Sequence, residues 1–170
     1  MYDIMNMPLI IITSYFITIL VSIIGTGFIF AKILKIEINR YQTHMYVLLG
    51  IISLTFISYF TNLFVAHNFL HNFLLLSIGL GAFIFGIYRK NINLSDIKKI
   101  IFFAILLILI SLLYKTHDDF DWYHLPYTLN VAQNKFQFGL GSFNLGFRTP
   151  SSLFYLNSLF YLPVIKFYSF

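Results

Sequence analysis

The longest uncharged stretch of the chain decides its fold. It runs from Tyr41 to Tyr88, "YQTHMYVLLGIISLTFISYFTNLFVAHNFLHNFLLLSIGLGAFIFGIY", and contains no Asp, Glu, Lys or Arg. A helix needs about 20 apolar residues to cross the hydrocarbon core of a bilayer, so this stretch is too long for one crossing and suits two. The polar sequence HNFLHN at residues 67–72 divides it. The pattern predicts a helical hairpin with membrane spans at about 46–66 and 73–88.

Three other apolar segments flank this hairpin, at about residues 8–31, 100–114 and 151–170. The first is uncharged and long enough to span. The second is short, and it crosses if Lys99 and Lys115 at its ends snorkel outward. The third is expected to be a fifth span or a re-entrant segment. Only 10% of the residues are charged, against about 25% in soluble domains. The sequence therefore predicts an all-α, polytopic integral membrane protein with four to five transmembrane helices in a single membrane domain.

Positive charge orients these predicted spans. Most of the Lys and Arg residues follow the first and third spans, whereas HNFLHN has none. Because cytoplasmic loops are enriched in Lys and Arg, the basic tracts are expected in the cytoplasm and the N-terminus outside. The fourth span then delivers residues 115–150 to the extracytoplasmic face. The basic residues form no basic face, so no nucleic-acid partner is expected, and the absence of cysteine excludes disulfides and thiolate metal sites.

The acidic segment "THDDFDWYHLP", Thr116–Pro126, holds three of the six carboxylates: Asp118, Asp119 and Asp121. Carboxylates this close repel one another unless cations or hydrogen-bond donors compensate. One interpretation is a general base or a cation site that faces the outer leaflet. The other is a solvated loop, in which Trp122 and neighbouring aromatic residues anchor at the interface and the aspartates cap the next helix. The charge pattern alone leaves both interpretations open.

A short amphipathic helix along the membrane surface is expected after this segment, because Pro126 suits a first helical turn. Its apolar side would carry Leu125, Leu129, Ala132 and Phe136, with Asn130, Gln133, Asn134 and Lys135 mostly opposite. The glycine-rich sequence GLGSFNLGFRTPSS at 139–152 is interpreted as a turn before a helix that starts near Ser151–Ser152.

Small residues in the predicted spans, and two histidines between the second and third spans, are expected to have structural roles. The glycines of "GTG" at Gly25–Gly27, of "GLGAFIFG" at Gly79–Gly86, and Gly50 are predicted to allow close helix packing. His67 and His71 are four residues apart, a spacing that metal sites use. They have no carboxylate nearby in the sequence, so a polar turn at the membrane interface is the expectation.

The acidic segment also carries a resemblance to a known family. The string DDFDWYHLP at 118–126, with FGLGSFN at 138–144, resembles the first large extracytoplasmic loop of multispanning GT-C glycosyltransferases, which use polyprenyl-phosphate sugars as donors. In that family an aspartate stands four residues before a tyrosine that is often followed by His-Leu-Pro, and here the spacing matches Asp119 and Tyr123. The sequence at 139–160 also resembles an uncharacterised family of bacterial polytopic membrane proteins commonly found near surface-polysaccharide functions.

This resemblance implies a hexosyl transfer with residues in named roles. Asp119 would be the base that deprotonates or orients the acceptor as it attacks the anomeric carbon of the sugar. Asp118, Asp121 and His124 would support it, and Tyr123, Arg148 and Lys135 would bind the substrate, the two cations stabilising the lipid-phosphate leaving group. Asp118 and Asp121 are the candidates to hold Mg²⁺ or Mn²⁺, if a metal is used.

The resemblance also implies where the protein acts and which molecules it meets there. It would act at the outer face of a bacterial inner membrane, with membrane lipids, a polyprenyl-phosphate-linked sugar and other envelope-biosynthesis membrane proteins as partners. Members of the family are much longer, and in many of them the acidic loop follows the first span, so the chain is expected to be the N-terminal part of a larger protein. The alternative is a non-enzymatic scaffold or accessory protein of a cell-envelope polysaccharide system. A transporter would need ionisable residues within the spans.

Overall fold

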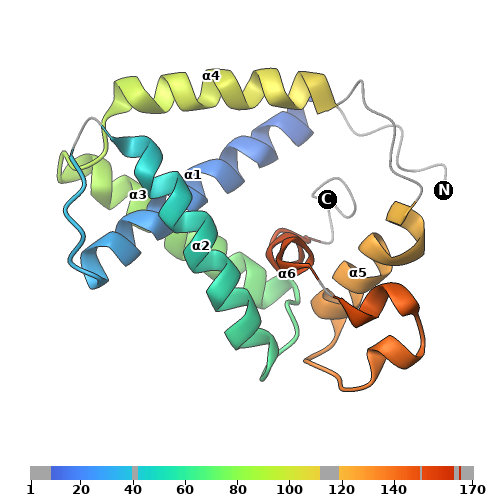
Figure 1. Ribbon diagram of the computed structural model, residues 1–170. Helices are drawn as coiled ribbons and strands as arrows, with labels where there is room; N and C mark the ends of the chain where they lie inside the picture. The colour runs from blue at the N-terminus through green and yellow to red at the C-terminus, as the bar shows by residue number, and fades with distance from the viewer. Residues whose placement is uncertain (1–8, 40–41, 112–118, 150, 163–164, 166–170) are drawn as a thin grey trace. The chain divides into compact units, whose positions relative to one another are not determined.

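The structure, a computed structural model, describes residues 9–39, 42–111, 119–149, 151–162 and 165. These residues form helices and connecting turns, with no strand among them, so the all-α prediction is confirmed (Figure 1). The long helices are α1 (Leu9–Ile33), α2 (Thr43–Asn62), α3 (Phe69–Tyr88) and α4 (Leu94–Ser111). The shorter ones are η2 (Phe120–His124), α5 (Leu125–Gln133), η3 (Leu140–Ser142), η4 (Leu145–Arg148) and α6 (Ser152–Ser158).

Three of the described helices, α1, α2 and α3, are long and apolar enough to cross a membrane. They coincide with the first three predicted spans, with ends displaced by a few residues. Large hydrophobic side chains such as Phe56, Phe60 and Ile84 are exposed on their surfaces. Large exposed apolar side chains on helices of this length are typical of contact with lipid or with another protein. The chain is therefore a helical membrane protein.

The last two predicted spans differ from the observed helices. Helix α4 begins at Leu94, earlier than expected, so Asp96 and Lys99 lie in its first turns and form an ion pair at 3.9 Å. Residues 112–114 of that predicted span lie outside the described residues. Helix α6 ends at Ser158, and its seven residues rise only about 10 Å, too little to cross a bilayer. Residues 163–164 and 166–170 of the last predicted segment lie outside the described residues.

The chain divides into two compact units, each described here by itself. The first contains Met1–Gly50 and Ile78–Tyr114, and the second contains Ile51–Ser77 and Lys115–Phe170. The core of the first unit is built from α1, the start of α2 and the region around α4. Its buried members are Ile24, Phe28, Ala31, Tyr46, Ile92 and Ile97.

Glycines set the close approach of helices in the first unit, as predicted. Gly25 of α1 faces α3, where a Cβ would overlap the carbonyl oxygen of Gly79 and lie 2.7 Å from the backbone nitrogen of Phe83. Gly27 faces α2 in the same way, and its Cβ would lie 2.8 Å from the backbone nitrogen of Gly50. Two glycines separated by one residue therefore serve two different neighbouring helices. Such contacts suit membrane helices, whose association depends on tight packing.

The second unit is centred on α5 and α6, which lie side by side, orange and red in Figure 1. Aromatic rings fill the space between them. Tyr127 contacts Phe147, Phe154 and Tyr155 with ring centroids 5.1, 5.5 and 6.0 Å apart. These offset and edge-on arrangements are the favourable ones for aromatic pairs.

The buried face of α5 differs from the predicted one. It consists of Tyr127, Thr128, Val131 and Ala132. Of the apolar residues expected there, Ala132 alone is fully buried, and Phe136 lies past the end of the helix and is 38% exposed. The correction has a physical cause: the helix packs against the aromatic side chains of α6, and Tyr127 supplies the largest surface for that contact.

Candidate functional site

The acidic segment begins with an unusual helical turn. Residues Phe120–His124 form a π-helix, which is closed by the Leu125 N–H donating to the Phe120 carbonyl. Single π-turns are rare and occur frequently at functional sites. Asp119, the residue before this turn, makes no capping hydrogen bond with its side chain. Instead its Oδ2 accepts a hydrogen bond of 3.4 Å from the Tyr123 hydroxyl. The Asp119 side chain therefore does not cap this turn.

Tyr123 is held in place by packing on both sides. A Cβ at Gly146 would lie 2.5 Å from the Tyr123 ring, so this glycine lets the loop approach the ring. On the other side the ring meets Phe154 edge-on, with centroids 6.2 Å apart. Partial burial, together with the neighbouring carboxylate of Asp119, raises the pKa of Tyr123 above its usual value. The phenol therefore stays protonated and remains a donor to Asp119.

A cavity of about 250 Å³ is lined by Phe120 and His124, which are the sequence neighbours of Asp119 and Tyr123. Its walls combine the apolar side chains of Phe120 and Phe154 with polar groups. The polar lining residues are His124, Thr128, Ser151 and Asn157. Ligand sites are typically apolar pockets with a few placed polar groups, at about 300–1,000 Å³ for drug-sized ligands. The cavity suits a group smaller than these, such as one sugar ring.

The other candidate residues are spread around this centre. Arg148 is exposed, and its Nε donates to the Gly141 carbonyl at 3.3 Å, in the glycine-rich loop that also contacts Tyr123. Asp121 is exposed, and Asp118 lies outside the described residues. Lys135 follows the C-terminal end of α5, at the opposite end of that helix from the acidic turn. The structure thus brings together Asp119, Tyr123 and His124, and it separates Lys135 from them.

Metal binding has no assembled centre among the described residues. There, no three His, Asp or Glu side chains come close enough together to hold an ion. This includes His67 and His71, whose rings stack at 4.8 Å. The proposed metal ligand Asp118 lies outside the described part of the chain.

A buried polar network, which the sequence analysis missed, supports the second unit. HNFLHN was expected to be a polar turn at the interface, yet His67 and Asn72 have no exposed surface. His67 Nδ1 lies 2.6 Å from Ser158 Oγ, and its Nε2 lies 3.1 Å from Thr61 Oγ1. Its backbone N–H donates to the Val131 carbonyl at 3.2 Å. The turn between α2 and α3 is therefore hydrogen-bonded to both α5 and α6.

Asn72 and Asn62 complete the network. The amide nitrogen of Asn72 donates to the carbonyls of His67, Ser158 and Tyr161 at 2.8, 2.8 and 2.9 Å. The amide nitrogen of Asn62 reaches the carbonyls of Val131 and Asn134 at 3.3 and 3.1 Å. The one sign of this network in the sequence was the presence of three polar side chains, those of Asn62, His67 and Asn72, in such an apolar sequence. It anchors the two helices that carry the cavity.

The network predicts a specific loss of stability in acid. Burial, with a smaller effect of the nearby His71, lowers the pKa of His67 from 6.5 to about 3, and a hydrogen bond to the Ser58 backbone opposes the shift. Between these values the unfolded chain binds more protons than the folded one, so stability should fall as the pH falls from 6.5 towards 3, by about 1.4 kcal/mol per pH unit. Above pH 6.5 this contribution is complete.

Thermal unfolding midpoints in detergent across this pH range measure the effect. His67→Gln keeps polar atoms in the site but cannot titrate, so its midpoint should depend less on pH than that of the unmodified protein. Identical pH dependence in the two proteins would contradict the assignment.

Comparison with known proteins identifies the family of the chain but not a function. No curated protein and no solved structure is detectably similar to this chain. One family model, described as a domain of unknown function, DUF8201, matches residues 7–170. The chain therefore belongs to the DUF8201 family.

Proposed function

We propose that this protein is a GT-C-like glycosyltransferase domain of a bacterial inner membrane, which transfers a sugar from a polyprenyl-phosphate donor at the outer face. One observation carries the proposal: the Asp119 carboxylate is hydrogen-bonded by Tyr123 and not used as a helix cap, and the residues next to this pair in the chain, Phe120 and His124, line a cavity with polar walls. The sequence similarity of the DDFDWYHLP segment to GT-C loops supports the same assignment.

In the proposed reaction, Asp119 accepts the proton of the acceptor hydroxyl while the hydroxyl oxygen attacks the anomeric carbon. The bond from that carbon to the lipid phosphate breaks, and its electron pair leaves with the phosphate. Tyr123 is a positioning residue: its raised pKa keeps the phenol protonated, so that it orients the carboxylate. His124 and Asn157 line the cavity that would receive the sugar. Arg148 would stabilise the departing phosphate, as preorganised cations do in such reactions.

The proposal includes a topology. Helix α4 would be a fourth crossing, and the hydrophobic segment predicted at 151–170 would be a fifth span or a re-entrant segment. Lys and Arg follow α1 and α3, which places those connections in the cytoplasm by the positive-inside rule. The N-terminus and the Asp119 segment would then lie outside the cytoplasm.

Substitution of Asp119 tests the catalytic assignment. Asp119→Asn removes the base and should slow sugar transfer by about 100-fold or more. Asp119→Glu should lose nearly as much, since the longer side chain displaces the carboxylate from Tyr123. The measurement is the release of polyprenyl phosphate from polyprenyl-phosphate sugars in proteoliposomes.

Glu37→Gln is the matched control, because it removes one exposed carboxylate in the other compact unit and should leave transfer unchanged. Transfer that survives Asp119→Asn would refute the role of Asp119. An unmodified protein that neither binds nor consumes the donors would refute the glycosyltransferase proposal itself.

A second candidate, an accessory protein of envelope polysaccharide synthesis, is favoured by a different observation. Aromatic and aliphatic side chains around the cavity-bearing loop are exposed, with Trp122 at 74%, Phe138 at 92% and Phe143 at 89%. Exposed apolar groups in one segment mark contact with a partner protein or a membrane. The accessory function predicts that Phe138→Ser together with Phe143→Ser abolishes surface glycan in cells, whereas Asp119→Asn does not.

A further inference from the structure

An opening in the described part of the first unit lies between α1 and α3, far in sequence from the acidic segment. It has a volume of about 740 Å³ and is bounded by the last turns of both helices. Residue Asn91, just after α3, closes one end. Its lining residues all belong to the first unit.

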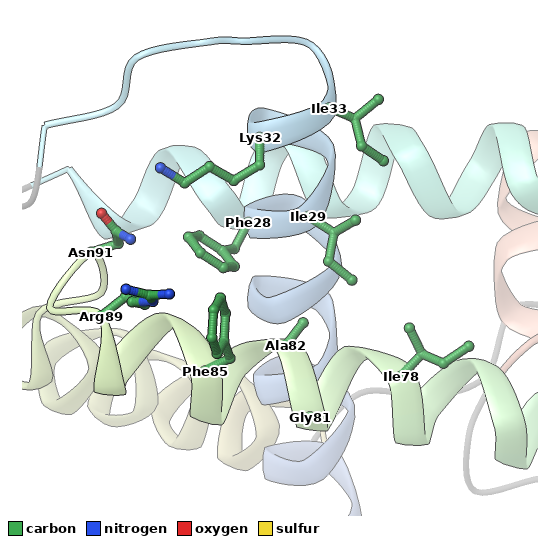
Figure 2. A pocket seen from close by; sticks show the side chains of 10 residues that line it. All are labelled: Phe28, Ile29, Lys32, Ile33, Ile78, Gly81, Ala82, Phe85, Arg89 and Asn91. Carbon is green, nitrogen blue, oxygen red and sulfur yellow. The ribbon is translucent and has the colours of Figure 1, made fainter.

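The cavity has a polar end and an apolar end. Figure 2 shows the side chains of Lys32, Arg89 and Asn91 together on one side. Ile29 and Ile78 lie on the other side, past two phenylalanine rings. An amphiphilic molecule with a charged head and a hydrocarbon tail matches this division.

Aromatic rings position the two cations at the polar end. Lys32 Nζ lies 5.7 Å from the centroid of the Phe28 ring, and Arg89 Cζ lies 5.2 Å from the centroid of the Phe85 ring. Both distances are within the range of cation–π attraction. The centroids of the Phe28 and Phe85 rings are 6.4 Å apart, so the two cations lie against adjacent aromatic rings.

The net positive charge at the polar end of the cavity favours the binding of one anion. Among the residues that the structure describes, no carboxylate lies within ion-pair distance of Lys32 or Arg89. Glu37 and Lys35, which line a neighbouring opening together with Lys32 and Asn91, carry opposite charges that cancel each other. The C-terminal ends of α1 and α3 each contribute a partial charge of about −0.5. Two full positive charges exceed these, which leaves about one net positive charge. A phosphodiester with a single negative charge balances it.

We propose that this cavity binds one anionic phospholipid of the membrane. Its phosphate lies between Lys32, Arg89 and Asn91, and an acyl chain lies along the apolar end. Gly81 provides the room for that chain, since a Cβ there would meet no atom within 4 Å. Helices α1 and α3 are long enough to cross a bilayer, and basic side chains at helix ends meet lipid phosphates at the membrane surface. The proposal does not depend on the glycosyltransferase assignment.

Binding of phosphatidylglycerol to the full chain in detergent, followed by native mass spectrometry, tests the polar end. Lys32→Gln together with Arg89→Gln should weaken binding about 10- to 30-fold. The matched control is Lys90→Gln together with Lys98→Gln, which removes two exposed cations of the same compact unit, one just after α3 and one in α4, and should change affinity by less than about twofold. Equal losses in the two double variants would show diffuse attraction to the basic surface and would overturn the proposal.

The apolar end has its own test, which changes no charge. Gly81→Leu places a side chain in the open space of the cavity and should also weaken phosphatidylglycerol binding about tenfold, with the thermal midpoint retained. Glycerol phosphate, which has the phosphate but no acyl chain, should not compete with the lipid. Undiminished lipid binding by Gly81→Leu, or competition by glycerol phosphate, would overturn the proposal that a lipid occupies the cavity.

Discussion

Asn72→Asp is expected to destabilise the protein by roughly 4 kcal/mol or more. The two N–H groups of the asparagine amide are shared among three backbone carbonyls, and none of the side chain is exposed. Aspartate has the same shape but only accepts hydrogen bonds, so both of these donors are lost, at a cost of about 1–3 kcal/mol each. Ionisation of the buried carboxylate adds a further penalty, which the protein can avoid only by protonating it.

The thermal unfolding midpoint in detergent measures this loss. Trp122, the only tryptophan of the chain, lies in the same compact unit and provides a fluorescence signal for it. Asn68→Asp is the control, because it is the same chemical change in the same turn at an exposed position. Asn68 Oδ1 accepts the His71 N–H at the start of α3, a role that aspartate fills equally well. Equal midpoints for the two variants would show that the network does not hold the unit together.

Gly25→Ala is expected to lower the stability of the first unit by about 3 kcal/mol or more, although it adds only one methyl group. The new Cβ would overlap the Gly79 carbonyl oxygen and lie 2.7 Å from the Phe83 backbone nitrogen. Both are backbone atoms, so no rotation of a side chain can relieve the overlap. The two helices must move apart, and the packing around Gly25 is lost. Overpacking of a tight core typically costs about 1–3 kcal/mol, and a backbone clash is at the upper end or beyond.

Gly81→Ala is the matched control for this effect. Gly81 lies on α3, but its added Cβ would meet no atom within 4 Å. Because alanine favours helix more than glycine does, this variant should be unchanged or more stable by up to about 1 kcal/mol. Helical content and the thermal midpoint of both variants, measured in the same detergent, make the comparison. Similar midpoints would contradict the close contact of α1 with α3.

The main features of the fold could be predicted because they are local. A crossing helix needs a fixed length of apolar sequence, whatever its neighbours are, so α1, α2 and α3 followed from the absence of charge in residues 8–31 and 41–88. The glycine contacts were predictable in kind for a similar reason, since small residues in membrane helices serve close packing. Which glycine meets which helix was not predictable: Gly25 and Gly27 face different partners, and Gly81 faces none.

The acidic segment was likewise predictable only in part. The spacing of Asp119 and Tyr123 singled out this pair from the sequence, and the structure joins them by a hydrogen bond. The π-turn that aligns them, and the packing of Gly146 against the Tyr123 ring, depend on contacts with residues more than twenty positions away. The spacing of residues in a sequence indicates which side chains lie close together within one helix. It does not indicate which side chains from other segments of the chain complete a site.

By itself, the sequence determined the helical class, the three long apolar helices and the glycine-rich turn that precedes α6. Tertiary structure alone decided which face of α5 is buried, where α6 ends, and that His67 and Asn72 lie in the interior. The physical reason is the location of the partners. Apolar length and turn propensity act between near neighbours, but the groups that satisfy Asn72 include the carbonyls of Ser158 and Tyr161, which come within reach only after the chain has folded.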